Sequence, residues 1–587
     1  MTDDISSRNQ DQQRQGSLLK GAEILWATLA AEGVTAVFGH PGGAILPAYD
    51  ALRKFPIRHI LARHEQGAAH MADGFARASG RVGVAVATSG PGATNLLTGI
   101  ATAMLDSVPM LCITGQVSSS VLGNDAFQEV DITGVTLPVT KHSFLVDRAE
   151  QVAPTLRRAL QLARSGRPGP VLVDITRDAQ QASAAFDFTA AEPESHRQHP
   201  MAGVNEAQLQ QAAELIQSSS RPLILAGHGV IASGAMEELR TLAERMQAPV
   251  ALTLLGLSAF PASHALNLGM MGMHGESWVN RAIQQADLLI ACGMRFGDRV
   301  IGRSTAYARN ARKIHIDIDP AEINKNVAAD VALTGDLRAV LKRLLPMVDC
   351  RPHSAWLSAI QSSRGENAVR DIQNLPDNGH LYAAHVMHDL WRITGGECIV
   401  VTDVGQHQMW EAQYFRHERP RSLLTSGGLG TMGFALPAAI GAKFACPEKE
   451  VWVIAGDGGF QMTQSELATI VQEKIKINIA IINNGYLGMV RQWQEFFYER
   501  NYEATPLVSP DFVKLADAHG IPGRAVRKRA EVEAAVEEAR GTPGPFLLNF
   551  MVEKEDAVYP MIPAGSALHE MIRRPEHDPL EERAEDK

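Results

Sequence analysis

The sequence has 587 residues, of which 45% are hydrophobic and 20% charged, and its formal net charge at pH 7 is −10. This composition is ordinary for a globular chain long enough for three or four domains, and no apolar run approaches the length of a membrane span. The negative charge, without a long cluster of Lys and Arg, argues against nucleic acid or an anionic membrane as a partner.

Residues 1–17 are polar and lack the apolar core of a signal peptide, so we expect a disordered N-terminal tail without a targeting signal. The cysteines are scattered and form no CxxC pair. They predict reduced thiols in a cytoplasmic protein and argue against disulfides or a zinc site; they are Cys112, Cys292, Cys350, Cys398 and Cys446.

Residues 18–185 alternate between helical spacing and short apolar runs, which predicts a doubly wound parallel-sheet α/β domain. We expect a helix over 21–32 and strands over 34–39, 57–62, 82–87, 110–114 and 171–175. Glu65 follows the second of these strands in the string Arg63-His64-Glu65-Gln66. A carboxylate in the first turn of a helix is favoured by the helix dipole, so its position alone does not indicate catalysis.

Residues 183–202 lose periodicity and predict a linker. A second α/β domain is expected over 203–346. Its string Gly227 to Ala232 reads GxGxxA, a weak dinucleotide signal, and no acidic residue stands about twenty positions on, so we reject a Rossmann NAD site. Three further segments lie on or after predicted strands: 268–275, 293–300 and 315–320.

Residues 347–380 predict a mixed linker with one short helix, and a third α/β domain is expected over 380–555. A predicted strand ends in the polar string 401–408, and the glycine-rich string 428–433 is expected to pack closely. Residues 556–587 begin apolar and end charged, which we interpret as a loop or lid followed by a disordered tail.

The most informative stretch runs from Gly456 to Asn484. A buried strand over 451–455 ends in Gly456-Asp457-Gly458-Gly459, a helix is expected over about 463–472, and a second apolar run over 477–482 ends in Asn483-Asn484. The 27 positions between Asp457 and Asn484 (484 − 457) suit one strand-to-strand crossover, which places both at the ligand-binding edge of a parallel sheet. A carboxylate, an amide oxygen and a carbonyl suit Mg²⁺ with phosphate oxygens. The alternative is an ordinary turn with an Asp helix cap, which the correctly spaced second half disfavours.

This stretch resembles the thiamine diphosphate (ThDP) motif, GDG followed by NN. Over roughly residues 20–570 the chain resembles the acetohydroxyacid (acetolactate) synthase catalytic large subunits. The resemblance implies pyrimidine-binding, central FAD-binding and diphosphate-binding domains in that order. It implies Asp457, Asn484 and the carbonyl of Tyr486 on Mg²⁺, which bridges to the diphosphate.

The resemblance also gives Glu65 the family's role at N1′ of the aminopyrimidine. Because the cofactor of this family lies between two subunits, it implies a homodimer or a dimer of dimers. The further ThDP contacts that it implies are Val404, Gln406, His407, Gly430, Met432, Gly458, Gly459, Leu487, Gly488 and Met489, with Met432 supporting the bent cofactor.

FAD is implied as a bound flavin without a net redox role. The residues implied for it are Arg167, Gly227, Met273, His274, Gly293, Arg295, Arg299, Asp317, Ile318 and Asp336. The string Asp125 to Asp131 resembles the family's DAFQE segment and places Phe127 and Gln128 near ThDP and substrate, although a Phe in a polar loop is often a core anchor. Trp493 in the RQWQ string is implied at the acceptor pocket, together with Arg299, although a Trp at helical spacing is usually core.

Three departures from the family pattern stand out: His40 replaces Tyr or Phe before Pro-Gly-Gly, Arg177 replaces Lys, and Gly297 replaces the first Asp of RFDDRV. They put in doubt one cofactor contact, the geometry of a site cation and the FAD loop, respectively.

The function implied is a ThDP- and Mg²⁺-dependent carboligase. Such an enzyme decarboxylates pyruvate on ThDP and transfers the hydroxyethyl carbanion to a second pyruvate, giving 2-acetolactate, or to 2-ketobutyrate, giving 2-aceto-2-hydroxybutyrate, in valine, leucine and isoleucine biosynthesis. Two rivals are disfavoured. The RQWQ string and segment 293–300 argue against a flavin-dependent pyruvate oxidase, and the retained Glu65, Asp457 and Asn484 argue against a catalytically silent ThDP-binding subunit. A separate small regulatory subunit is compatible with the resemblance, because no such domain is fused to this chain.

Overall fold

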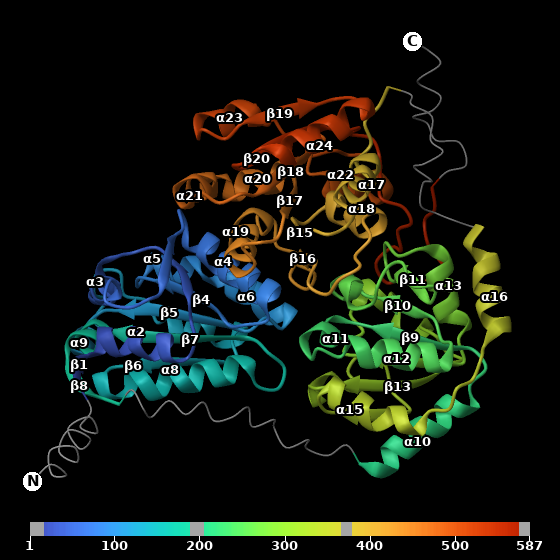
Figure 1. Ribbon diagram of the computed structural model, residues 1–587, viewed down its shortest axis with the longest axis horizontal. Helices are drawn as coiled ribbons and strands as arrows, with labels where there is room; N and C mark the ends of the chain where they lie inside the picture. The colour runs from blue at the N-terminus through green and yellow to red at the C-terminus, as the bar shows by residue number, and fades with distance from the viewer. Residues whose placement is uncertain (1–16, 188–204, 366–378, 575–587) are drawn as a thin grey trace, which may run out of the picture. The chain divides into compact units, whose positions relative to one another are not determined.

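The computed structural model describes residues 17–187, 205–365 and 379–574 (Figure 1). The expected tails at 1–16 and 575–587, and the linker residues 188–202 and 366–378, lie outside these ranges. The chain divides into two compact units: unit 1 spans residues 1–199, 428–448 and 463–475, and unit 2 spans 200–427, 449–462 and 476–587. Within the described ranges, no helix is both long and apolar enough to cross a membrane.

Unit 1 is built on a six-stranded parallel sheet with the order β3-β2-β4-β5-β7-β6. Its strands are β2 (Ala36–Gly39), β3 (Arg58–Leu61), β4 (Gly83–Ala87), β5 (Met110–Gln116), β6 (His142–Val146) and β7 (Pro170–Thr176). The central strands are runs of buried Val, Ile, Leu and Ala, as parallel strands covered on both faces require.

Helices cover both faces of this sheet, which confirms the doubly wound prediction (Figure 1). One face packs against α2 (Gly21–Ala31), α3 (Leu46–Leu52) and α8 (Ala149–Arg164), and the other against α4 (Glu65–Ser79) and α6 (Leu97–Asp106). Shorter helices connect them: α5 (Pro91–Asn95), α7 (Ile132–Thr136) and α9 (Arg177–Gln181).

The linker prediction is wrong at its start. Residues Ser183–Phe186 form β8, which pairs antiparallel with β1 (Ser17–Lys20), so the expected tail also ends before Ser17. Ala184 and Phe186 are buried while Ser183 and Ala185 are exposed, but four residues are too few for such alternation to be recognised in the sequence. The partner strand, moreover, is more than 160 positions away along the chain, so no local pattern indicates the pairing.

Two helices of unit 1 pack backbone to backbone. A side chain at Gly74 of α4 would overlap the carbonyl of Ala438, and one at Gly441 would overlap the carbonyl of Met71. Ala438 and Gly441 belong to α19 (Ala435–Ala445), which lies far from α4 in the sequence. Only glycine at both positions permits this approach.

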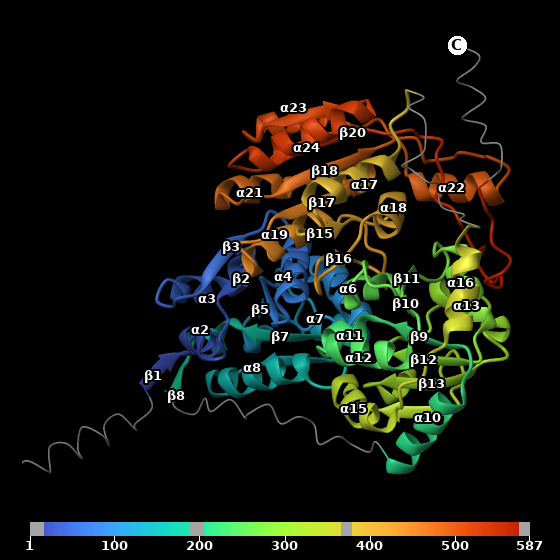
Figure 2. The same cartoon turned by 45° about the vertical axis from the view of Figure 1, so that its right-hand side comes forward.

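The central sheet, in unit 2, has the parallel order β11-β10-β9-β12-β13-β14. Its strands are β9 (Pro222–Ala226), β10 (Val250–Leu252), β11 (Asn267–Met270), β12 (Leu288–Cys292), β13 (Arg312–Asp317) and β14 (Val331–Thr334). One face packs against α10 (Glu206–Ser218), α12 (Met236–Met246) and α15 (Leu337–Leu344), the other against α13 (Ser277–Gln285) and α16 (Ser354–Ser362) (Figures 1 and 2). Two short helices, α11 (His228–Ala232) and α14 (Asp298–Ile301), follow β9 and β12.

The third sheet, also in unit 2, has the parallel order β16-β15-β17-β18-β20-β19. Its strands are β15 (Ile399–Thr402), β16 (Leu423–Thr425), β17 (Val451–Gly456), β18 (Asn478–Asn483), β19 (Gly523–Val526) and β20 (Phe546–Met551). Numbered by their own sequence, its strands run 2-1-3-4-6-5, as do those of the first sheet, whereas the central sheet runs 3-2-1-4-5-6.

Helices α17 (Ala383–Thr394) and α24 (Val532–Gly541) share a core with one face of the third sheet. Its other helices are α18 (Gln406–Tyr414), α20 (Asp457–Thr463), α22 (Gly488–Phe497) and α23 (Phe512–Ala518). The helix expected over 463–472 is in fact two helices: α20 begins at Asp457 itself, and α21 (Leu467–Glu473) follows a 3₁₀ turn over Gln464–Glu466.

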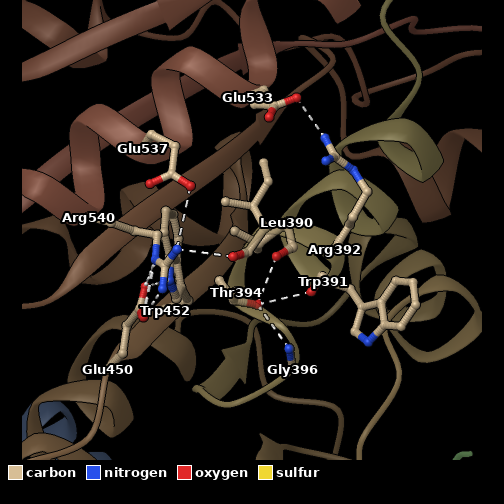
Figure 3. A network of polar contacts seen from close by, with 11 residues as sticks. Leu390, Trp391, Arg392, Thr394, Gly396, Glu450, Trp452, Glu533, Glu537 and Arg540 are labelled. Atoms are coloured by element: carbon tan, nitrogen blue, oxygen red, sulfur yellow. Dashed lines mark hydrogen bonds and ion pairs between the residues drawn. The ribbon is translucent and has the colours of Figure 1, made fainter.

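A polar network lies at the amino end of the third sheet (Figure 3). Arg540 of α24 donates to both oxygens of Glu450 at 3.0 and 3.3 Å and to the carbonyl of Ile393 at 3.0 Å. Trp452 of β17 donates to the same Glu450 at 2.7 Å. The network therefore ties α17, α24 and the start of β17 together, at the opposite end of this strand from Asp457.

Candidate functional site

Asp457 and Asn484 lie at one edge of the third sheet, as the sequence predicted. Asp457 directly follows β17 and Asn484 directly follows β18, and these two strands are parallel neighbours. The strand order reverses between β15 and β17, and the crevice at such a reversal is where open parallel sheets bind ligands.

Asp457 is a buried carboxylate, 1% exposed, with only neutral donors around it. Ser509 donates to its Oδ2 at 2.9 Å. Burial raises the pKa of Asp457, and hydrogen bonds from Ser509 and from the N–H groups of Asn484 and Gly458 offset part of that rise. Within the described ranges Asp457 forms no ion pair, so a divalent cation would supply the positive charge that this carboxylate lacks.

A chain of amides orients Asn484. Its Oδ1 accepts from the N–H of Tyr486 at 3.1 Å, and its Nδ2 donates to Gln406 at 3.3 Å. Gln406 in turn donates to Gln492 at 2.9 Å and to the carbonyl of Asp556 at 3.2 Å. The donor set of Asp457, Asn484 and the Tyr486 carbonyl contains hard oxygen atoms only and thus fits Mg²⁺. A cluster of three or more His, Cys, Asp or Glu side chains suited to a transition metal is absent from the described part of the chain.

The glycine at the start of α22 leaves space beside these amides. A side chain at Gly488 would overlap Gln406 Oε1 and would lie 2.6 Å from Asn484 Nδ2. The Nε2 of His407 accepts from the N–H of Gly456, the residue before Asp457, at 3.2 Å. Burial lowers the pKa of His407 to about 3, so the imidazole is neutral at physiological pH.

The remaining residues predicted for ThDP divide between the two units. Val404, Gly458, Gly459, Tyr486, Leu487 and Met489 lie in the loops and helix starts that follow β15, β17 and β18 of unit 2. Gly430 and Met432 belong to unit 1, in the loop before α19. That loop is anchored on α6, because Gly428 donates to Asp106 at 2.7 Å and Thr431 bonds Thr102 at 2.7 Å.

Glu65 begins α4 in unit 1, and its side chain is almost buried at 9% exposure. Its Oε2 accepts from Asn95 Nδ2 at 2.9 Å, and Gly92 lies close to its Oε1. Asn95 ends α5, the short helix that follows β4, so the start of α4 and the end of α5 together fix the carboxylate. No sequence pattern assigned Asn95 a role.

Phe127 is not a core anchor, because its side chain is 88% exposed. The loop that carries it is nevertheless ordered by its own residues. The N–H of Ala126 donates to Glu129 at 2.8 Å, Gln128 has a positive φ of 59°, and Gln116 of β5 donates to the carbonyl of Val130 at 2.9 Å. The loop therefore presents an aromatic side chain outward from a fixed backbone.

The residues predicted for FAD in unit 2 gather at the carboxyl edge of the central sheet. Gly227 follows β9, Gly293 and Arg295 follow β12, Asp317 ends β13, Ile318 comes next, and Asp336 begins the turn into α15. Gly227 and Gly293 hold two loops in direct backbone contact, since Gly229 donates to the carbonyl of Gly293 at 3.0 Å and a side chain at Gly293 would lie 2.6 Å from the Cα of Gly229. The GxGxxA string thus serves a loop-to-loop contact. Arg167 belongs to unit 1, where it donates to Ser107 at 2.8 Å.

A second group of predicted residues surrounds the C-terminal segment. His274 bonds the carbonyl of Pro560 at 3.0 Å, the N–H of Met273 donates to Arg299 O at 2.8 Å, and Ile562 donates to Met273 O at 3.1 Å. Burial lowers the pKa of His274 to about 4. The structure thus brings Met273, His274 and Arg299 together.

Trp493 is partly buried rather than wholly in the core. Its ring packs against the central-sheet core, lies 5.2 Å from the ring of Phe497, and faces the guanidinium of Arg299 at 5.9 Å. Two residues predicted for the acceptor pocket, far apart in the sequence, are therefore in contact.

The three departures lie in loops and helix starts that follow strands. His40 bonds the carbonyl of Ala62 at 2.9 Å through its ring, Arg177 begins α9, and Gly297 caps α14 with open space where a side chain would project. Sequence reasoning missed Ser509 and Gln492, which bear directly on Asp457 and Gln406. Ser509 belongs to no recognisable pattern, because it lies in a loop 52 positions beyond Asp457. Gln492 stands in the RQWQ string, but the resemblance assigned a role to Trp493 and none to Gln492.

Three family models match the chain in order. They are the thiamine pyrophosphate enzyme N-terminal TPP binding domain over residues 19–135, the central domain over 209–344 and the C-terminal TPP binding domain over 403–550. The chain is 46% identical over 564 residues to an acetolactate synthase of Mycobacterium bovis, covering 94% of this chain and 91% of that one. It is 45% identical over 562 residues to the acetolactate synthase isozyme 2 large subunit of Escherichia coli K12, covering 95% and 100%. It is 47% identical over 562 residues to the acetolactate synthase large subunit of Corynebacterium glutamicum, covering 94% and 89%.

Proposed function

The chain belongs to the acetolactate synthase large subunits of the thiamine pyrophosphate enzymes, and from that membership we propose how its own residues carry out the reaction. It is a ThDP-dependent transferase, a carboligase that decarboxylates pyruvate and joins the two-carbon fragment to a second 2-ketoacid. Pyruvate as acceptor gives 2-acetolactate, and 2-ketobutyrate gives 2-aceto-2-hydroxybutyrate. We assign the three sheets to its pyrimidine-binding (18–185), central (203–346) and diphosphate-binding (380–555) domains.

The observation that carries the proposal is the buried Asp457 carboxylate, which has no basic partner among the described residues and lies beside Asn484 at the strand-order reversal. We propose that Asp457, Asn484 and the carbonyl of Tyr486 hold Mg²⁺, and that Gln406, neutral His407 and the N–H groups near Gly458 and Gly488 bind the diphosphate. When bound, ThDP supplies a carbanion nucleophile that makes loss of CO₂ from a 2-ketoacid possible. These residues would hold the cofactor, and Glu65 would supply a carboxylate to its aminopyrimidine.

Glu65 is the proposed acid–base group. Its carboxylate is nearly buried and is oriented by Asn95, which suits a group that exchanges a proton with one nitrogen atom. We propose that each active site takes Glu65 from one copy of the chain and Asp457 from another, in a homodimer or a dimer of dimers. The outward-facing Phe127 (88% exposed) and Leu137 (69% exposed) support an apolar interface on unit 1.

The acceptor pocket is proposed at the contact between Trp493 and Arg299. An indole offers a flat surface to the alkyl group of the acceptor, and a guanidinium is a partner for its carboxylate. Gln128 and Phe127 are proposed to complete this pocket from a second copy.

FAD is proposed at the carboxyl edge of the central sheet, with the residues named above for it. The 3-2-1-4-5-6 strand order supports the proposal, because it is an order that binds dinucleotides at this edge. The purified protein should carry a flavin absorption spectrum that turnover does not change stoichiometrically. Removal of FAD without any loss of activity would contradict the assignment.

Two further proposals concern the cell. All five cysteines are free thiols, which supports a reducing, cytoplasmic location. The relatives from Escherichia coli and Corynebacterium glutamicum are named large subunits, so we propose that a separate small regulatory subunit binds this chain.

One assay tests the function against both rivals. Purified protein is incubated with pyruvate, ThDP, Mg²⁺ and FAD, and acetolactate, acetate and oxygen consumption are measured. Acetolactate without oxygen consumption is expected. Acetate with one oxygen consumed per pyruvate would indicate a pyruvate oxidase, and no product would indicate a silent ThDP-binding subunit.

A further inference from the structure

The loop that leads into Glu65 is held by a second buried carboxylate, Glu466. Its side chain is fully buried and accepts from the N–H of Arg63 at 3.0 and 3.1 Å and from the N–H of His64 at 3.1 Å. Thr469 donates to the same carboxylate at 2.6 Å. Arg63 and His64 are the two residues immediately before Glu65, so Glu466 satisfies the backbone donors that precede α4.

Other contacts from the same segment hold this loop. The Oγ1 of Thr469 also lies 3.1 Å from the carbonyl of Leu61, so its single proton is shared between this carbonyl and Glu466. The side chain of Arg63 donates to Gln472 at 2.7 Å. All of these residues belong to unit 1, where α21 lies beside β3 (Figure 2). The junction between β3 and α4 is therefore bound by one short segment, and Glu466 makes the most contacts in it.

The space for this carboxylate depends on a glycine. A side chain at Gly67, two positions after Glu65, would overlap Glu466 Oε1. Burial raises the pKa of Glu466, and the hydrogen bonds from Thr469, Arg63 and His64 offset part of that rise. A buried acid at this position is costly unless the donors around it are fixed, so the carboxylate and the loop backbone determine each other's position.

We infer that Glu466 is a positioning residue for Glu65. It acts by fixing the backbone of Arg63 and His64, and with it the first turn of α4, from which the Glu65 carboxylate projects. The inference rests on the proposed acid–base role of Glu65, and it assigns a task to a residue between Asp457 and Asn484 that neither metal binding nor diphosphate binding uses.

The test is a double-mutant cycle between Glu65→Gln and Glu466→Ala. Both single variants and the double variant are assayed for kcat at saturating ThDP and Mg²⁺. A misplaced catalytic group costs up to about 10²-fold in rate, so we expect Glu466→Ala to lower kcat by about that factor. In the Glu65→Gln background the same change should alter kcat by no more than about twofold, because the group that it positions is already absent. Losses that multiply in the double variant would overturn the inference, since Glu466 would then act independently of Glu65.

Conservative variants separate positioning from stability. Glu466→Gln keeps an acceptor for Arg63 and His64, and its amide can donate to Thr469, so its kcat should fall by less than about tenfold. Gly67→Ala retains Glu466 but displaces its carboxylate, and it should reproduce the loss seen in Glu466→Ala. Glu473→Gln is the matched control: it removes a carboxylate of α21 that pairs with Arg58, at the other end of β3, at 2.8 Å, and its kcat should stay unchanged. If Glu466→Ala does not fold, Gly67→Ala carries the same cycle.

A second readout does not depend on turnover. Hydrogen exchange of a peptide covering residues 62–68 is measured in cofactor-free protein. Faster exchange is expected in Glu466→Ala and Gly67→Ala and unchanged exchange in Glu473→Gln; unchanged exchange in all three would overturn the inference. Failure of the proposed function is recognised separately, because Glu65→Gln would then itself turn over at the wild-type rate.

Discussion

The first and third sheets have the same strand order but carry different chemistry at their carboxyl edges. In the third sheet, the loops after the two middle strands β17 and β18 supply Asp457 and Asn484. In the first sheet, the corresponding loop after β4 supplies hydroxyl groups and Asn95, and the carboxylate comes from Glu65 after β3. The topology thus fixes where the loops meet. The residues of the loops decide whether that place suits a metal ion or a group that exchanges a proton.

The largest loss of function is expected from a substitution at Asp457. Asp457→Ala removes the only carboxylate of the proposed metal site, so ThDP should no longer bind at micromolar concentrations and activity should be lost. Calorimetric titration with ThDP and Mg²⁺ measures this directly. Glu450→Gln, at the other end of β17, is the control and should bind ThDP normally; retained affinity in Asp457→Ala would remove the metal site from the third sheet.

The proposed acid–base role of Glu65 is tested by Glu65→Gln, which keeps the size of the side chain but removes its acid–base chemistry. A positioned acid or base contributes about 10²–10⁴-fold, and we expect kcat to fall within that range. ThDP affinity should change far less than in Asp457→Ala, because the two sheets serve different tasks. Wild-type turnover in the folded variant would show that Glu65 is only a carboxylate at a helix start.

The proposed acceptor pocket is tested by Trp493→Leu. The two acceptors differ by one methylene, which a hydrophobic pocket distinguishes by about 1–3 kcal/mol. We expect near-normal acetolactate formation and a clear fall in the preference for 2-ketobutyrate, measured with both ketoacids competing in one vessel. Because Trp493 also packs against the central-sheet core, thermal unfolding is measured in parallel. An unchanged product ratio would leave Trp493 with a packing role alone.

The smallest effect is expected at the amino end of the third sheet, in the network of Figure 3. Arg540→Gln removes partly exposed ion pairs with Glu450 and Glu537, so the free energy of unfolding should fall by about 1 kcal/mol. The kcat should not change, because this end of the sheet carries no proposed site residue. A loss of kcat larger than the loss of stability explains would show that the two ends of the sheet are coupled.

The sequence predicted the three sheets and the edge that carries Asp457 and Asn484, because buried parallel strands are continuous apolar runs and the turn residues after them are distinctive. It did not predict β1 and β8, which are short and pair across most of the first domain, and it also missed β6, β16, β19 and β20. It placed the helix start at Thr463 rather than Asp457, because two glycines after Asp457 indicated a loop.

Side-chain partners were the part of the site that could not be predicted. Ser509, Asn95 and Glu466 each bond a predicted site residue or its neighbour, yet each comes from another loop or helix. Their roles arise from tertiary proximity, which a periodic pattern does not encode. The resemblance to a family supplied roles for motif residues and left these partners unassigned.

The glycine contact between α4 and α19 fixes the position of α4, the helix that begins at Glu65. Gly74 is nine residues from Glu65, roughly 14 Å along the axis at 1.5 Å per residue. A methyl group at Gly74 would overlap the backbone of Ala438, so α4 and α19 would have to move apart. Because the packed interior transmits strain, we expect this displacement to reach the start of α4 at Glu65. Screens for variants of altered rate should therefore find substitutions at this remote crossing, where no substrate or cofactor is touched. Substitutions at Gly74 and Gly441 should be tolerated only when α4 and α19 both shift to make room.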